Sequence, residues 1–162
     1  MPGSLCVSCP TSQCCYVLGS GRLRGLWATS DAGKHWVKRR LPGSTYFASV
    51  DFPTSLTGWV VSADGTVLKT VDGGVTWTKQ RAGSELGISN EVCFTDARHG
   101  WVVGAQGLIL HTDDGGAQWT EQSSGTTSTL EDVCFVDRLH GWAVGGDVRL
   151  RTTNGGLTWV EL

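Results

Sequence analysis

Short apolar runs alternate with turn-forming residues along the whole chain. In residues 91–122 the runs are EVCF, GWVVG, LILHT and QWTEQ, and the segments TDARH, AQG and DDGG lie between them. Runs of four to five residues that are rich in Val, Trp and Thr and bounded by Gly and Asp are typical of β-strands. No segment has the 3.6-residue apolar period of an amphipathic helix. The pattern therefore predicts an all-β domain, with four short strands in this stretch.

The same four-strand unit occurs four times. Each unit closes with a Trp, at positions 36, 77, 119 and 159, so the spacings are 41, 42 and 40 residues. Upstream of each Trp lies a second recurring block: CCYVLGSG, TGWVVSADG, HGWVVGAQG and HGWAVGGD. About forty residues with four strands is the size of one propeller blade. We therefore predict a β-propeller, or a propeller segment, of four four-stranded antiparallel blades. The single domain covers 1–162, with blades at about 1–42, 43–84, 85–126 and 127–162.

An eight-residue closing turn ends each unit, in the forms TSDAGKHW, TVDGGVTW, TDDGGAQW and TTNGGLTW. Its Asp or Asn can accept backbone N–H groups within the turn, its Gly can adopt the left-handed conformation, and its Trp can pack beneath. The alternative is a calcium loop, which needs several oxygen ligands and a terminal Glu, whereas this motif has one carboxylate. We interpret the turn as structural. Its residues are Asp31, Gly33, Trp36, Asp72, Gly74, Trp77, Asp114, Gly116, Trp119, Asn154, Gly156 and Trp159.

Charge and composition exclude several classes of protein. The net charge is −2, which gives no reason to expect a nucleic-acid partner. The first 81 residues nevertheless sum to +5 and the rest to −7, an asymmetry that can steer association. No apolar run is long enough to insert into a membrane, and MPGSLCVSCP lacks the regions of a signal peptide. Any targeting segment is therefore absent from this chain. His99 and His140 repeat singly at one turn, so we expect no metal and no other cofactor.

Four of the six cysteines lie within ten residues of the first unit, which indicates a local disulfide and an oxidising compartment. Cys9 and the Cys14–Cys15 pair flank one hairpin turn, so we expect Cys9 to pair with Cys14 or Cys15. Cys6 could then form a disulfide with whichever of Cys14 and Cys15 remains. Cys93 and Cys134 occupy equivalent positions on the first strands of adjacent units, too far apart for a disulfide. We expect both to be buried free thiols.

The predicted loops separate onto two faces of the blades, because successive strands run in opposite directions. The closing turns occupy one face. The other face carries the more varied connections, and varied loops on a rigid frame commonly carry function. It would present five arginines and two aromatic residues, which suit an acidic or carboxylate-bearing protein segment. The alternative is a solvated charged rim. The residues are Arg22, Arg24, Arg39, Arg40, Arg81, Tyr46 and Phe47.

Two motifs resemble known repeats. The form (S/T)-x-D-x-G-x-x-W resembles the Asp-box of the bacterial neuraminidase repeat. The longer pattern V-x-F-x-D-x-x-H-G-W-x-V-G, followed by (I/L)-L-x-T-x-D-G-G-x-x-W, resembles the repeats of the photosystem II stability/assembly factor family. This resemblance implies a non-catalytic scaffold that binds a protein partner, such as a membrane-complex subunit. It also implies a secreted, periplasmic or thylakoid-lumenal location. The first unit departs from the pattern, since SCPTSQCCYVLG brings cysteines into it.

Asp-box blades also occur in sialidases and other glycosidases, so a carbohydrate-binding or degenerate glycosidase-type propeller is the alternative. A sialidase needs an arginine triad, a Tyr nucleophile with its Glu, and an acid/base Asp. Tyr16 lies at a core position, and Tyr46 has no Glu at a matching repeat position. The acids outside the repeat pattern lie in the connections between units, and nothing pairs them across a cleft. These acids are Glu85, Glu91, Glu131 and Asp132. We therefore expect no enzyme.

The ends of the blade series carry a further expectation. The first and last units each hold all four strands, so no blade is shared between the two ends of the chain. Four blades are at the small limit for a propeller. An open arc would expose apolar flanks on the first and last blades. We expect those flanks to be covered, either by a second copy in an eight-blade homo-oligomer or by a larger subunit. The alternatives are a tight four-blade monomer and a segment of a longer propeller.

Overall fold

The structure is a computed structural model, and it describes residues 6–19, 24–43, 46–81 and 89–162. Sixteen strands form four four-stranded antiparallel sheets, each built from four consecutive strands, and we call them blades 1 to 4 in chain order. The predicted fold class is confirmed. The strands are β1 (Cys6–Ser8), β2 (Cys15–Gly19), β3 (Gly25–Thr29), β4 (Val37–Arg39), β5 (Phe47–Asp51), β6 (Gly58–Ser62), β7 (Val67–Thr70), β8 (Thr78–Arg81), β9 (Ser89–Phe94), β10 (Gly100–Gly104), β11 (Ile109–Thr112), β12 (Thr120–Glu121), β13 (Asp132–Phe135), β14 (Gly141–Gly145), β15 (Val148–Thr152) and β16 (Val160–Glu161). In the described part of the chain a 3₁₀ turn, η2 (Ala105–Gly107), lies between β10 and β11.

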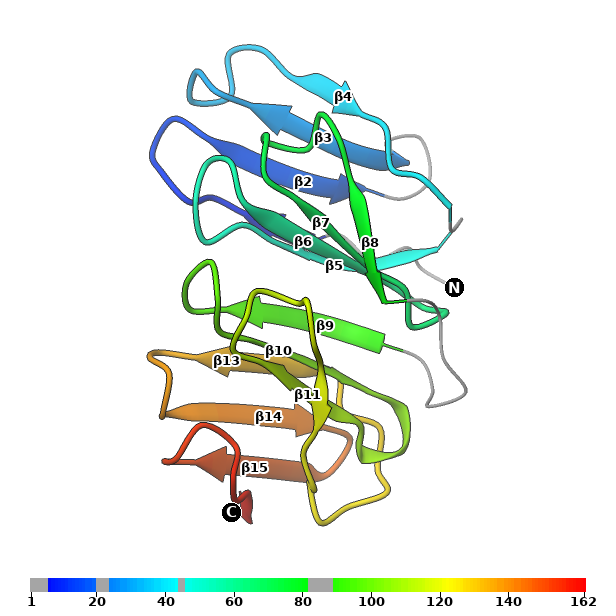
Figure 1. Ribbon diagram of the computed structural model, residues 1–162, viewed down its shortest axis with the longest axis vertical. Helices are drawn as coiled ribbons and strands as arrows, with labels where there is room; N and C mark the ends of the chain where they lie inside the picture. The colour runs from blue at the N-terminus through cyan, green and yellow to red at the C-terminus, as the bar shows by residue number, and fades with distance from the viewer. Residues whose placement is uncertain (1–5, 20–23, 44–45, 82–88) are drawn as a thin grey trace.

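The four blades are stacked along the long axis of the molecule, with blade 1 and blade 4 at opposite ends (Figure 1). The turns that join the first strand to the second, and the third to the fourth, lie on one side of the stack. The remaining connections lie on the other side, as the alternating strand direction requires (Figure 1). None of the helical segments in the described part of the chain has the length and apolar character to cross a membrane.

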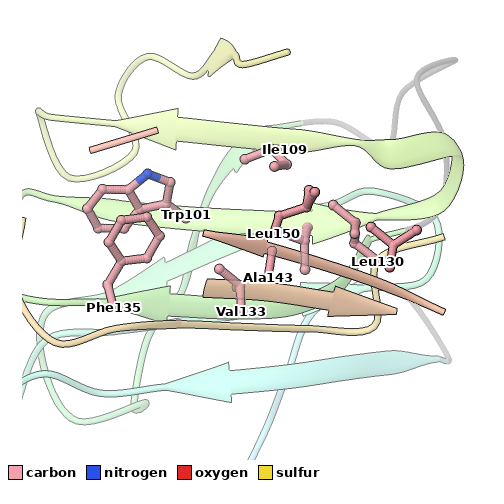
Figure 2. Packing of buried hydrophobic residues seen from close by; sticks show 9 residues of the cluster. Trp101, Ile109, Leu130, Val133, Phe135, Ala143 and Leu150 are labelled. Carbon is pink, nitrogen blue, oxygen red and sulfur yellow. The ribbon is translucent and has the colours of Figure 1, made fainter. Parts of the chain in front are cut away.

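Successive blades are held together by one repeated aromatic arrangement. Trp101 of β10 stacks on Phe135 of blade 4, with ring centroids 3.5 Å apart and planes 8° from parallel (Figure 2). Phe135 in turn meets the edge of Trp159, the Trp of its own closing turn, at 5.8 Å. Such stacked and edge-on pairs add to the large apolar area that the rings bury. The same three-ring arrangement recurs as Tyr16–Phe52–Trp77 and Trp59–Phe94–Trp119.

The Gly that precedes the second-strand Trp is part of this arrangement. Gly100 lies opposite Phe94 in the β9–β10 ladder, and a Cβ on Gly100 would collide with the Phe94 ring. The ring therefore lies flat over the glycine and is free to stack on the blade before it. Gly58 with Phe52, and Gly141 with Phe135, have the same relation. In the recurring Gly-Trp pair, the Gly thus leaves room for the Phe ring of its own blade, and the Trp stacks on the Phe of the next blade.

Blade 1 replaces this Phe–Gly pair with a disulfide. Cys9 and Cys15 are joined, so of the two partners considered for Cys9 the bond goes to Cys15. In the repeat alignment Cys9 stands where Phe94 stands in blade 3, and Cys15 where Gly100 stands. Cys14 and Cys6 are free thiols, so the expected second pairing is wrong. The reason is that the Cys6 thiol points to blade 2, where it donates to the Val50 carbonyl at 3.5 Å.

Candidate functional site

Each closing turn uses its own carboxylate or amide oxygen for internal hydrogen bonds. Asp72 accepts the amide N–H groups of Val75 and Thr76 at 3.0 and 2.9 Å. Thr70 Oγ1 donates to Asp72 at 2.8 Å and accepts the Gly74 N–H at 2.9 Å. Hydrogen bonds from the Thr76 hydroxyl and amide lower the pKa of Asp72 to about 2. Because the carboxylate is fully engaged inside its turn, it has little capacity left for a ligand.

The other closing turns follow the same plan. Hydrogen bonds from the His35 amide and ring lower the pKa of Asp31 to about 2, and the Gln118 amide lowers the pKa of Asp114. Asn154 Oδ1 accepts the Thr158 N–H at 3.0 Å. The left-handed glycines are Gly33, Gly74, Gly116 and Gly156, with φ of 84°, 80°, 90° and 86°. Of the closing Trp residues, Trp77, Trp119 and Trp159 are half-buried, and Trp36 is 41% exposed. Among the described residues no group of three His, Cys, Asp or Glu is placed to hold a metal ion.

The arginines of the predicted rim lie in different surroundings. Arg24 and Arg40 are exposed, but Arg39 extends between blades 1 and 2, where its Cγ lies beside Gly74 and its Nε is buried. Arg39 is the last residue of β4 and Arg40 follows the strand, so the two side chains lie in different surroundings. Arg81 is the last residue of β8, and Arg22 lies outside the described residues.

The two predicted aromatic residues, Phe47 and Tyr46, also lie in different surroundings. Phe47 begins β5 and packs against the core between blades 1 and 2. Tyr46 is 76% exposed and lines an open groove of about 860 Å³. Trp77 and Lys79 line the same groove, together with Asp64 from the turn between β6 and β7. This turn lies on the side away from the closing turns, so the groove opens on the predicted binding face (Figure 1).

A second polar region lies where the first strands of the four blades run side by side. Asp51 accepts the Phe94 amide N–H at 2.7 Å and the Ser8 hydroxyl at 3.0 Å. Ser49 Oγ donates to the Glu91 carboxylate on the next blade. Burial raises the pKa of Glu91 to about 7, and the nearby Asp132 carboxylate adds to the effect.

This inner region corrects two expectations from the sequence. Glu91 lies inside β9 and Asp132 begins β13, so neither is in a connection, and the Ser49 hydroxyl donates a hydrogen bond to Glu91. The repeat alignment already indicated a strand position for Glu91, because it puts Glu91 at the position of Ser49 in the blade before. Glu85 lies outside the described residues. Cys93 is partly buried against blade 4, and burial raises its pKa to about 12. Cys134 is exposed, because no further described blade covers its side of blade 4.

Comparisons with known proteins agree with the repeats. Residues 85–124 match the sequence model described as photosynthesis system II assembly factor YCF48. No curated protein sequence matches the chain significantly. A solved structure of YCF48 bound to D1 peptide is similar, with 22% identity and a TM-score of 0.77 over 99% of this chain and 53% of that chain. The chain thus spans about half the length of the YCF48 protein.

Glycoside hydrolases share the fold as well. The GH74 enzyme of Niastella koreensis is 18% identical, with a TM-score of 0.75 over 97% of this chain and 28% of that chain. The GH74 xyloglucanase of Xanthomonas campestris is 18% identical, with a TM-score of 0.66 over 93% of this chain and 28% of that chain. At this level of identity a structural likeness speaks for the fold and not for the function. One stretch of the chain, residues 85–124, therefore matches the YCF48 sequence model, and the chain as a whole has a propeller fold that YCF48 and GH74 enzymes share.

Proposed function

We propose that this protein is a non-catalytic β-propeller scaffold that binds a segment of another protein, such as a subunit of a membrane complex, in an extracytoplasmic compartment. The observation that carries the proposal is the groove beside Tyr46, an exposed aromatic side chain on the face with the varied connections. The similar YCF48 structure contains a D1 peptide, which supports a peptide as the ligand here.

The groove has the chemistry of a peptide site. Tyr46 and Trp77 offer ring surfaces, and such residues dominate the energy of protein interfaces. The Asp64 carboxylate is held within its own turn by the Ser62 hydroxyl and by the Thr66 N–H at 3.0 Å. Exposed Lys79 supplies a cation for a carboxylate of the bound segment. We therefore expect an extended segment with an aromatic or aliphatic anchor and a carboxylate.

Fluorescence anisotropy of a labelled peptide tests this function. The probe is the D1 peptide, used with a free and with an amidated C-terminus. Tyr46→Ala should raise Kd about tenfold, the typical effect of truncating an interface hot spot. Lys79→Ser should weaken binding less and should flatten its salt dependence, because it removes a screened charge pair.

The matched control lies on the opposite face. Arg138 is an exposed cation in the turn between β13 and β14, on the side away from the groove (Figure 1). Arg138→Ser should leave Kd and its salt dependence unchanged. Unaltered affinity in Tyr46→Ala and Lys79→Ser, with both variants folded, would remove the groove as the binding site.

A carbohydrate-active propeller is the second candidate, and Glu91 is the observation in its favour. A carboxyl with a pKa of about 7 beside a second carboxyl is the usual state of a glycosidase acid. However, Glu91 is half-buried at a blade interface, where the Ser49 hydroxyl donates a hydrogen bond to it. We expect no release of reducing sugar from xyloglucan. Release that Glu91→Gln abolishes would instead establish the enzyme.

A further inference from the structure

The junction between blades 1 and 2 contains a hollow of about 280 Å³, walled by the closing turns of both blades. It lies between two described blades, so its existence does not depend on where the chain ends. Polar and reactive side chains from both blades line it, and the wall includes Cys14, Ala28, Asp31, His35, Arg39 and Asp72. This hollow is separate from the groove beside Tyr46, with which it shares no lining residue.

A small residue at one repeat position leaves the room for the hollow. Ala28 holds the position in β3 that Lys69 and His111 hold in the third strands of blades 2 and 3. Lys69 Nζ crosses its junction and donates to the Gly115 carbonyl at 2.8 Å, and the His111 ring lies 4.9 Å from the Trp101 ring. The methyl group of Ala28 is too short for either contact, so the space at its junction stays open.

Arg39 lines the hollow with a guanidinium that is not paired. It holds the repeat position of Gln122, whose Nε2 donates to the Gly155 carbonyl at 2.9 Å and whose Oε1 accepts Trp159 Nε1 at 3.4 Å. Arg39 Nε, by contrast, is buried and has no hydrogen-bond partner, and no ion pair in the described part of the chain includes this guanidinium. A guanidinium binds a carboxylate through two parallel N–H groups, so an unpaired one in a hollow favours a carboxylate ligand.

Cys14 adds a reactive group to the same wall, since it is a half-buried free thiol. Burial raises the pKa of the Tyr16 hydroxyl, the Cys14 thiol raises it further, and the Arg39 guanidinium lowers it. The thiol and the guanidinium are therefore both close to one hydroxyl group. Cys15, the neighbour of Cys14 in the chain, is already bonded to Cys9, so it has no thiol to displace a group attached to Cys14.

We propose that this hollow binds a low-molecular-weight disulfide that carries a carboxylate, and that Cys14 captures half of it as a mixed disulfide. The carboxylate pairs with the Arg39 guanidinium, which places the S–S bond beside the thiol. The Cys14 thiolate attacks one sulfur, and a new S–S bond forms as the old one breaks. The other half leaves as a thiolate and takes up the proton that Cys14 lost, so the reaction requires no further oxidant.

The wall also limits the charge of the ligand. Asp31 and Asp72 line the hollow, and hydrogen bonds from His35 and Thr76 lower their pKa values to about 2, so both are ionised at neutral pH. These carboxylates repel a ligand half with several negative charges. The half that enters therefore carries a single carboxylate, as in the disulfide of a simple mercapto acid, and not a phosphate group.

Rates of mixed-disulfide formation at Cys14 test the proposal. The probes are dithiodipropionate, with a carboxylate on each half, hydroxyethyl disulfide, which is neutral, and cystamine, with an ammonium on each half. Peptide mapping by mass spectrometry without reduction follows the product at Cys14. Dithiodipropionate should react about tenfold faster than hydroxyethyl disulfide, because the guanidinium concentrates the carboxylate beside the thiol.

Two variants separate this site from a general effect of charge. Arg39→Gln introduces the residue that blades 2 and 3 have at this position, Gln80 and Gln122, so blade 1 should fold. It should lower the ratio of the dithiodipropionate rate to the hydroxyethyl disulfide rate by about tenfold. Arg40→Gln is the matched control, because it removes an exposed cation that does not line the hollow, and it should leave the ratio unchanged.

Three results would overturn the proposal. The first is an unchanged ratio in Arg39→Gln. The second is a faster reaction with cystamine than with dithiodipropionate, which would mean that Asp31 and Asp72 dominate the field in the hollow. The third is the absence of a product at Cys14 with all of the probes.

Discussion

Trp101 and Trp142 are the same residue of the repeat in two different surroundings. Both follow Gly in the second strand of a blade, and both lie opposite a first-strand Cys, Cys93 or Cys134. Trp101 is 0% exposed and Trp142 is 37% exposed. The local sequence therefore fixes the strand and the side to which each ring points, but burial depends on whether another blade is present. Identical motifs should contribute unequally to stability.

The largest expected difference comes from removing the two rings. Trp101→Ala should lower the free energy of unfolding by about 3–5 kcal/mol, since it deletes a fully buried ring and leaves a cavity against Phe135. Trp142→Ala should cost less than about 1 kcal/mol, because the ring is partly in solvent and stacks on nothing in the described chain. Urea denaturation of both variants measures the difference. Equal losses would mean that the stack does not hold the blades together.

A half-buried carboxyl and an exposed one at the same repeat position, Glu91 and Asp132, give the second contrast. Glu91 has a folded-state pKa of about 7 against an ordinary value of 4.5. A raised carboxyl pKa contributes stability that is fully present below the unfolded value and is lost as pH rises through the folded value. Between these values the loss is about 3 kcal/mol. Glu91→Gln should therefore flatten this fall and stabilise the protein at neutral pH.

Unfolding at a series of pH values measures the effect of Glu91→Gln. Glu121→Gln is the control, because Glu121 is an exposed carboxyl, whereas Asp132 at the equivalent position of blade 4 itself raises the pKa of Glu91. The closing-turn aspartates act in the opposite sense. Asp31 and Asp72 have pKa values of about 2, so the stability they contribute is lost only as pH falls below their ordinary value of 3.8. Above about pH 5 the stability that Asp31 and Asp72 contribute therefore does not change with pH. An unchanged pH profile in Glu91→Gln would show that Glu91 is solvated.

The repeat alignment predicted those features that depend on one blade alone. The strand number, the left-handed turn glycines and the pairing region of Cys9 all follow from short-range patterns. Features that depend on two blades were harder to predict. Glu91 acquires its raised pKa from burial between blades and from the Asp132 carboxylate on the next blade, and Cys134 is exposed because its blade has no described neighbour on that side. Whether Arg39 and Arg40 act together stays a prediction, with Arg39 half-buried and Arg40 exposed.

Blade 1 offers the third contrast, since a covalent bond there replaces the Phe–Gly pair. Cys9→Ser with Cys15→Ser should lower the free energy of unfolding by about 2 kcal/mol, as the short loop between the cysteines predicts from chain entropy. This is a smaller loss than that for Trp101→Ala. Adding a reductant to the unmodified chain should reproduce it, and the doubly substituted variant should not respond to the reductant. A loss as large as that of Trp101→Ala would mean that the disulfide also holds blade 1 against blade 2.

The smallest expected effect separates a closing turn at an inner interface from one on an outer flank. The turn of Asp72 packs on blade 1, where Gly73 lies close to the Tyr16 hydroxyl and Gly74 beside Leu26. Asp72→Ala removes the acceptor for the Val75 and Thr76 amides and should lower the melting temperature by about 3 °C.

Asp31 makes the matching bonds to His35, but its turn belongs to the outer side of blade 1, where Trp36 is 41% exposed. Asp31→Ala should therefore lower the melting temperature less than Asp72→Ala, because a loosened turn there disturbs no neighbouring blade. Neither change should alter peptide affinity, since neither Asp31 nor Asp72 lines the groove beside Tyr46. Equal shifts in the two variants would show that each turn stabilises only its own blade. Lost peptide binding in folded Asp72→Ala would contradict the structural role of the turn.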